Sequence, residues 1–105
     1  MNASPNTVDI TSLNSVLVGS VTYAGSQHLG CLYGFPKLRV TSGDWLSVYK
    51  SPTSAIGDFT CPVYTGDGII GALRITWGTD IKFIPLKNSY DSGDNTAQFS
   101  LFYKI

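Results

Sequence analysis

The sequence predicts an all-β fold, an antiparallel β-sandwich of the jelly-roll kind or a related barrel, with little or no helix. None of the 105 residues is Glu, and the other residue types that favour helices are scarce. Val, Ile, Phe, Tyr and Trp together number 28 and favour strands, whereas Ser and Thr together number 22 and suit turns. Short apolar–polar alternations between Gly- and Asp-containing turns therefore predict about seven to nine short strands.

The length and the first residues predict one domain preceded by a short arm. A chain of 105 residues can build one hydrophobic core and leaves little room for a second. Residues 1–7 are polar and contain Pro5, so we expect an N-terminal arm or linker there. Residues 8–105 are then expected to form a single β-sandwich domain.

The N-terminal third predicts three strands. Apolar residues within 8–13 give a weak first strand. Residues 16–23 alternate better, and Gly19 allows a bulge within them. The glycine-rich residues 25–34 predict a turn followed by a short strand.

The middle third predicts a hairpin, a loop and an edge strand. Apolar runs on either side of residues 41–44 predict a hairpin over residues 38–49. Residues 51–58 contain Pro, Ser and Gly and predict a loop. Pro62 interrupts the strand expected over 59–64, and because Pro cannot donate to a sheet, that segment is expected to be an edge strand or irregular.

The last third gives the clearest pattern. Apolar residues alternate on both sides of residues 78–80, and a three-residue loop there keeps one face apolar. This loop would pair Trp77 with Ile81 and Ile75 with Phe83. A closing strand over 97–105 alternates in the same way. The residues predicted to face the core are Leu73, Ile75, Trp77, Ile81, Phe83, Phe99, Leu101 and Tyr103.

The charge balance excludes several classes of partner. Seven Lys plus Arg against seven Asp give no surplus with which to neutralise a phosphate backbone, so we expect no nucleic-acid partner. No run of 18 apolar residues is present, so we expect no membrane insertion. The first residues lack the cationic start and apolar block of a signal peptide, so synthesis in the cytoplasm is expected.

The inventory of reactive side chains predicts a protein that is not an enzyme and that binds no metal or cofactor. His28 is the single histidine, and a lone histidine in a glycine-containing loop favours an exposed side chain over a metal ligand or general base. Cys31 and Cys61 could form a disulfide between facing strands. Without a secretion signal, the sequence favours two reduced thiols instead. No four-ligand zinc set is present.

A polar loop between residues 87 and 96 holds the remaining candidates for ligand binding. Asp91 and Asp94 resemble a calcium loop in composition, but the segment lacks the spaced ligands and the Glu of an EF-hand, which favours a polar hairpin loop. Tyr90 in the same loop is free for contacts. Tyr90, Asp91, Asp94 and His28 are therefore the candidate binding residues.

Apolar residues exceed what one buried face of each strand requires. Phe102 lies on the face opposite Phe99 and Leu101, and Ile84 breaks the alternation after Phe83. A neighbouring copy is the natural cover for such residues, since large exposed apolar patches are unusual on monomers. A net charge of zero does not oppose self-association. We expect a homo-oligomer, with a trimer favoured and Phe102 and Ile84 at its interface.

Residues 71–83 and the terminal residues 99–105 resemble the C-terminal head domains of phage receptor-binding proteins and tail-fibre tips. In both, a strand of the Leu-x-Ile-Thr kind turns through a glycine-containing loop into a second apolar strand, and the chain ends on an apolar-aromatic strand. The resemblance implies a trimeric β-sandwich on a virion, as a fibre tip, head fibre or capsid decoration protein. Its partner would be a host-surface saccharide, a protein receptor or other virion proteins. The alternative is a free-standing lectin-like carbohydrate-binding domain.

Overall fold

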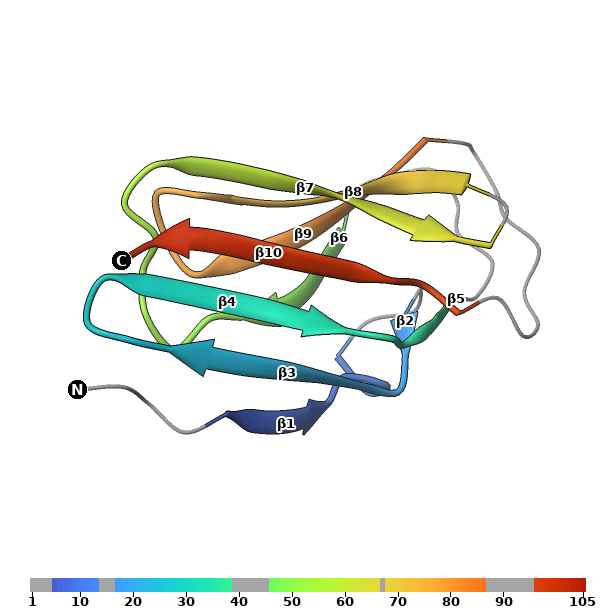
Figure 1. The fold of residues 1–105 in the computed structure, drawn as a ribbon, viewed down its shortest axis with the longest axis horizontal. Helices are drawn as coiled ribbons and strands as arrows, with labels where there is room; N and C mark the ends of the chain where they lie inside the picture. The colour runs from blue at the N-terminus through green and yellow to red at the C-terminus, as the bar shows by residue number, and fades with distance from the viewer. Residues whose placement is uncertain (1–4, 14–16, 39–45, 67, 87–95) are drawn as a thin grey trace.

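A computed structural model describes residues 5–13, 17–38, 46–66, 68–86 and 96–105 of the chain. These residues form ten strands and no helix. Eight of the strands form two antiparallel four-stranded sheets that pack face to face, as Figure 1 shows. The predicted all-β sandwich is confirmed. Within the described part, no helix is long and apolar enough to cross a membrane.

The two large sheets differ in how the chain connects their strands. The sheet nearer the viewer in Figure 1, the front sheet, has the order β1-β3-β4-β10, and the back sheet has the order β6-β9-β8-β7. In the back sheet, β7, β8 and β9 are neighbours in chain order, and β6, which precedes them in the chain, lies beside β9. This is the strand order of a Greek key. The front sheet comprises β1 (Asn6–Asp9), β3 (Ser20–Gly25), β4 (Leu29–Gly34) and β10 (Phe99–Lys104). The back sheet comprises β6 (Leu46–Lys50), β7 (Asp58–Thr65), β8 (Gly68–Thr76) and β9 (Asp80–Pro85). A small two-stranded sheet joins β2 (Leu17–Val18) to β5 (Lys37–Leu38).

The core lies between the two sheets and follows the predicted alternation. Along β10 buried and exposed side chains alternate strictly, because a strand directs successive side chains to opposite faces. Seven of the eight residues predicted to face the core are buried: Leu73, Ile75, Ile81, Phe83, Phe99, Leu101 and Tyr103. Their faces were therefore assigned correctly.

The prediction for the eighth residue, Trp77, is wrong, because its side chain does not face the core. Its side chain is 71% exposed, and it is the first of the three residues between β8 and β9. The turn has the predicted length but begins one residue earlier than expected, so Leu73 rather than Ile75 lies opposite Phe83. The register shifts by two residues, which is one full period of the strand alternation. All the remaining side chains therefore keep their predicted faces.

Three further expectations are corrected. The described residues of the expected 38–49 hairpin belong to different sheets, since β5 pairs with β2 whereas β6 pairs with β9. The expected strand 16–23 is divided at Gly19, whose φ of 122° is open to glycine and strained for other residues. This break lets β2 and β3 join separate sheets. Residues 6 and 7, expected in the arm, belong instead to β1, which pairs with β3.

The sandwich is joined along one side. β7 is an edge strand of the back sheet, as Pro62 predicts, and β10 is an edge of the front sheet. The two edges meet where the amide of Tyr64 donates to the carbonyl of Gln98 at 3.1 Å and the amide of Gln98 donates back at 2.8 Å. The free edges of both sheets, β1 and β6, therefore lie on the other side of the sandwich.

Candidate functional site

Of the four candidate binding residues, the structure describes only His28. Tyr90, Asp91 and Asp94 lie outside the described residues. His28 is exposed in the turn between β3 and β4, where its carbonyl accepts a hydrogen bond from the amide of Ile105 at 3.1 Å. Among the described residues, no group of three His, Cys, Asp or Glu side chains lies close enough to hold a metal ion.

The two residues expected at an oligomer interface lie on opposite faces of the molecule. Phe102 is on β10 of the front sheet and is 55% exposed, whereas Ile84 is on β9 of the back sheet and is 37% exposed. Both point away from the core, as the sequence predicts. A contact made by the front face alone would therefore cover Phe102 but not Ile84.

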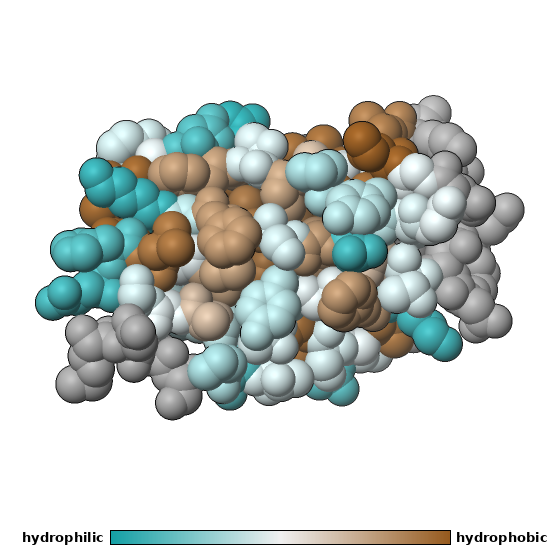
Figure 2. Space-filling view, in the orientation of Figure 1, coloured by the Kyte–Doolittle hydropathy of each residue, from teal (hydrophilic) through white to brown (hydrophobic). Residues whose placement is uncertain are grey.

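Phe102 belongs to an apolar row that crosses the front sheet. It lies opposite Cys31 of β4, which in turn lies opposite Ala24 of β3. On β4, the exposed side chains of Leu29 and Tyr33 lie on either side of Cys31 on the same face. Figure 2 shows hydrophobic side chains gathered over the middle of this sheet. We call Ala24, Cys31 and Phe102 the front apolar row.

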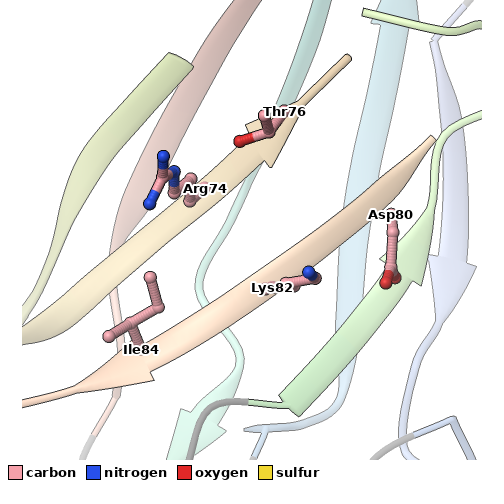
Figure 3. A pocket seen from close by; sticks show the side chains of 5 residues that line it. All are labelled: Arg74, Thr76, Asp80, Lys82 and Ile84. Atoms are coloured by element: carbon pink, nitrogen blue, oxygen red, sulfur yellow. The ribbon is translucent and has the colours of Figure 1, made fainter. Parts of the chain in front are cut away.

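The outer face of the back sheet is different, because it carries a shallow polar groove. The groove has a volume of about 360 Å³, and Figure 3 shows the five side chains that line it: Arg74, Thr76, Asp80, Lys82 and Ile84. Arg74 and Lys82 are direct cross-strand partners. Two like charges in this arrangement destabilise a sheet unless an acid lies nearby.

Asp58 of β7 supplies a compensating charge for Arg74. Its Oδ1 accepts from Arg74 Nε at 2.9 Å and from Thr76 Oγ1 at 3.1 Å, and its Oδ2 accepts from the second guanidinium nitrogen. The bidentate bond from Arg74 holds the pKa of Asp58 below its ordinary value, and the same contact raises the pKa of Arg74. Both side chains remain about half exposed, so the pair is open to a ligand.

Asp80 presents an unused acceptor at the other end of the groove. Its Oδ1 is buried and has no hydrogen-bond partner among the described residues. A buried carboxylate oxygen without a donor is costly, and such atoms in native structures call for an explanation.

Trp77, beside Thr76, is the feature that the sequence analysis missed. Its φ is 39°, and it is the only non-glycine residue with positive φ in the described part of the chain. This conformation costs about 1–3 kcal/mol and persists only when the surroundings impose it. The signal was ambiguous, because an apolar residue directly before Gly78 fits both the last inward position of a strand and the first position of a turn.

The two cysteines are free thiols in different settings. Cys31 is on the outer face of the front sheet, and burial raises the pKa of its thiol. Cys61 packs against the core from β7, and burial raises the pKa of its thiol to about 11. Both thiols are therefore less ionised near neutral pH than an ordinary cysteine.

Three comparisons, with protein-family models, with curated proteins and with solved structures, found no match. The function is therefore inferred from three features of the surface: the front apolar row, the polar groove and the exposed Trp77.

Proposed function

We propose that this chain is a non-enzymatic surface module of a virion, of the fibre-tip, head-fibre or capsid-decoration type. In this proposal it works as a homo-oligomer, with a trimer favoured, and attaches the particle to the host surface. The front apolar row carries the proposal, since it places the half-exposed ring of Phe102 in a continuous apolar strip across three strands.

A second copy of the chain is the occupant that this face suits best. Apolar strips on the outer face of a sheet need cover, and no helix in the described residues lies over the front sheet. Beside the row lie Tyr33 and the apolar side chain of Leu29, and the exposed Lys104 lies opposite Leu29 at the end of β10. Three front faces turned towards a common axis would bring the Phe102 rings together. A stable interface needs about 800 Å² per partner, so Leu29 and Tyr33 would have to be included.

Oligomerisation also suits attachment to a surface. Several weak sites on one rigid particle bind a repetitive surface much more tightly than one site does, by a factor of about 10² to 10⁴. A small domain whose individual sites are shallow therefore gains most of its affinity from assembly.

Sedimentation equilibrium at micromolar concentration tests the proposal. We expect the parent protein to sediment as an oligomer, and Phe102→Ser to lower its mass towards the 11.3 kDa protomer. Ile84→Ser is the matched control, because it makes the same kind of change on the opposite face and should leave the mass unchanged. A clean monomer that Phe102→Ser does not alter would contradict the proposal.

The thiol of Cys31 gives a second measurement on the same face. Because Cys31 lies directly opposite Phe102, an interface over the row would protect it from iodoacetamide. We expect alkylation of Cys31 to be slow in the oligomer and faster in Phe102→Ser. Equal rates in both proteins would place the interface elsewhere.

The second candidate function is a free-standing lectin-like carbohydrate-binding domain, and the exposed Trp77 favours it. The two candidates differ in mass: a monomer that binds sugar supports the lectin, whereas an oligomer that loses cell binding in Phe102→Ser supports the virion module.

A further inference from the structure

The backbone of Trp77 is held by hydrogen bonds to the loop that connects β6 to β7. Its amide donates to the carbonyl of Gly57 at 2.8 Å. The next two turn residues are also bonded to this loop, since the carbonyl of Gly78 accepts from the amide of Ala55 and the carbonyl of Thr79 from the amide of Ser51, both at 2.7 Å. Three backbone bonds therefore impose the turn that carries the exposed indole.

The polar groups next to Trp77 are equally well ordered. Asp58 directly follows Gly57, whose carbonyl accepts the hydrogen bond from the Trp77 amide. Asp58 lies opposite Thr76 in the sheet register. Arg74 and Thr76 both donate to Asp58, so a carboxylate, a hydroxyl and a guanidinium lie together beside the turn. Figure 3 shows Arg74 and Thr76 on β8 at one side of the polar groove.

This combination matches the chemistry of a neutral pyranose. Such a sugar has one face of C–H groups, which packs on an aromatic ring, and a rim of hydroxyls, each of which donates and accepts hydrogen bonds. An ionised carboxylate has more acceptor sites than Arg74 and Thr76 use, so Asp58 can still accept from a hydroxyl.

Other classes of ligand suit these groups less well. A free guanidinium fork is the best match for a phosphate or a carboxylate of an acidic sugar, but Asp58 already occupies the fork of Arg74. A protein partner needs a broad apolar surface, whereas the groove that Arg74 and Thr76 help to line has mainly charged and hydroxyl-bearing side chains. The charges of Asp58 and Arg74 cancel, which favours an uncharged ligand.

We propose that Trp77, Asp58, Arg74 and Thr76 form a binding site for a neutral pyranose of a host-surface saccharide. The pyranose ring stacks on Trp77, and its hydroxyls bond to Asp58, Arg74 and Thr76. The inference rests on the proposed attachment function and names its ligand class. One stacked ring and a few hydrogen bonds give an affinity of about 1 mM for each site, which assembly then raises.

Tryptophan fluorescence of the oligomeric protein tests the site. Trp45→Phe leaves Trp77 as the only tryptophan, so its emission reports directly on the site. The protein is first applied to a printed array of neutral and acidic glycans, and the best neutral glycan is then titrated up to about 100 mM. We expect a saturable change in emission, and no change with inorganic phosphate or N-acetylneuraminic acid.

Two variants in different parts of the site check the assignment. Trp77→Gly, measured by calorimetry because it lacks the fluorophore, and Asp58→Asn should each weaken binding by about tenfold or more. Glycine accepts the positive φ of Trp77, so Trp77→Gly is expected to stay folded by circular dichroism. The proposal is overturned if no neutral glycan binds, if only acidic glycans or phosphate bind, or if both variants bind as the parent does.

The same proteins separate this inference from the proposed function. Phe102→Ser should lower the mass and the binding to cells while leaving the affinity of each site for the glycan unchanged. An oligomer without glycan binding overturns the saccharide site alone. A monomer with glycan binding overturns the oligomeric module alone.

Discussion

The hydroxyl of Tyr103 lies 2.7 Å from the hydroxyl of Ser51, and this bond ties the C-terminal strand to the loop that holds Trp77. Ser51 has one proton, and it goes to the carbonyl of Thr53 at 2.6 Å. Tyr103 is therefore the donor to Ser51. The Tyr103 ring covers Gly30, where an added Cβ would lie 2.6 Å from the ring, so this arrangement requires glycine.

Ser51→Ala and Tyr103→Phe are expected to destabilise the fold unequally. Ser51→Ala leaves the buried Tyr103 hydroxyl without a partner and should cost about 1–3 kcal/mol. Tyr103→Phe should cost about 1 kcal/mol, because Ser51 keeps its bonds to Thr53. Urea unfolding of both variants and of the double variant measures the coupling. Tyr103→Phe should cost little or nothing in the Ser51→Ala background, and an equal cost in both backgrounds would rule out the bond.

Leu101→Ala tests the core. Leu101 is fully buried and lies opposite Leu32, so its truncation should lower the free energy of unfolding by about 2–5 kcal/mol. Ser100→Ala is the matched control, since Ser100 is the preceding residue on the outer face and should change stability by less than about 0.5 kcal/mol. Similar costs for both variants would show that the faces of β10 are assigned incorrectly.

Substitutions at Trp77 test whether its backbone is strained. Trp77→Gly and Trp77→Ala remove the same indole, but only glycine adopts a φ of 39° without a steric penalty. Trp77→Gly should therefore be more stable than Trp77→Ala by about 1 kcal/mol in urea unfolding. If Trp77→Gly is also more stable than the parent, Trp77 is retained at a cost to folding, as expected for a binding residue.

The faces of the strands could be predicted from the sequence because alternation alone sets them. The register between β8 and β9 could not, since a three-residue turn starting at Trp77 or at Gly78 keeps the same face apolar. The failed hairpin has a similar cause. Turn residues and flanking apolar runs describe a local pairing, but β6 obtains its partner from β9, far along the sequence.

The candidate site was harder to predict than the fold. Phe102 was identified as an exposed residue because it breaks the pattern of a half-buried strand. Asp58 and Arg74 carried no comparable signal, because Asp58 follows a glycine and resembles an ordinary turn residue. Their pairing depends on the register between β7 and β8, which a sequence pattern does not fix.

Iodoacetamide is expected to alkylate the two cysteines of the Phe102→Ser protein at different rates. The pKa of Cys61 is about 11 against an ordinary 9.0, so about a hundredfold less thiolate is present near pH 8 than in the unfolded chain. Iodoacetamide should modify Cys31 first and Cys61 much more slowly, as peptide mass spectrometry would show. In urea both thiols should react at similar rates. Equally fast modification of Cys61 in the folded protein would contradict its burial against the core.

Asp58 should make stability depend on acid pH. Its bond to Arg74 lowers its pKa in the folded chain below the ordinary 3.8, so the unfolded chain takes up the proton first as the pH falls. The stability that ionised Asp58 supplies is thus fully present above about pH 4 and is lost as the pH falls through the lower folded pKa. Asp58→Asn lacks this contribution, so the stability difference between parent and variant should be larger near pH 6 than near pH 2.

Asp9→Asn is the control that tests whether the charge of Arg74 causes the acid dependence at Asp58. The pKa of Asp9 is also lowered, but by hydrogen bonds from Thr11 rather than by a cation. Both variants should therefore show acid dependence in urea unfolding, whereas only the Asp58 effect should shrink in about 1 M salt, because salt screens exposed ion pairs. A pH effect of Asp58→Asn that salt leaves unchanged would mean that the hydrogen bonds from Thr76 and Arg74, and not the charge of the guanidinium, hold the carboxylate ionised.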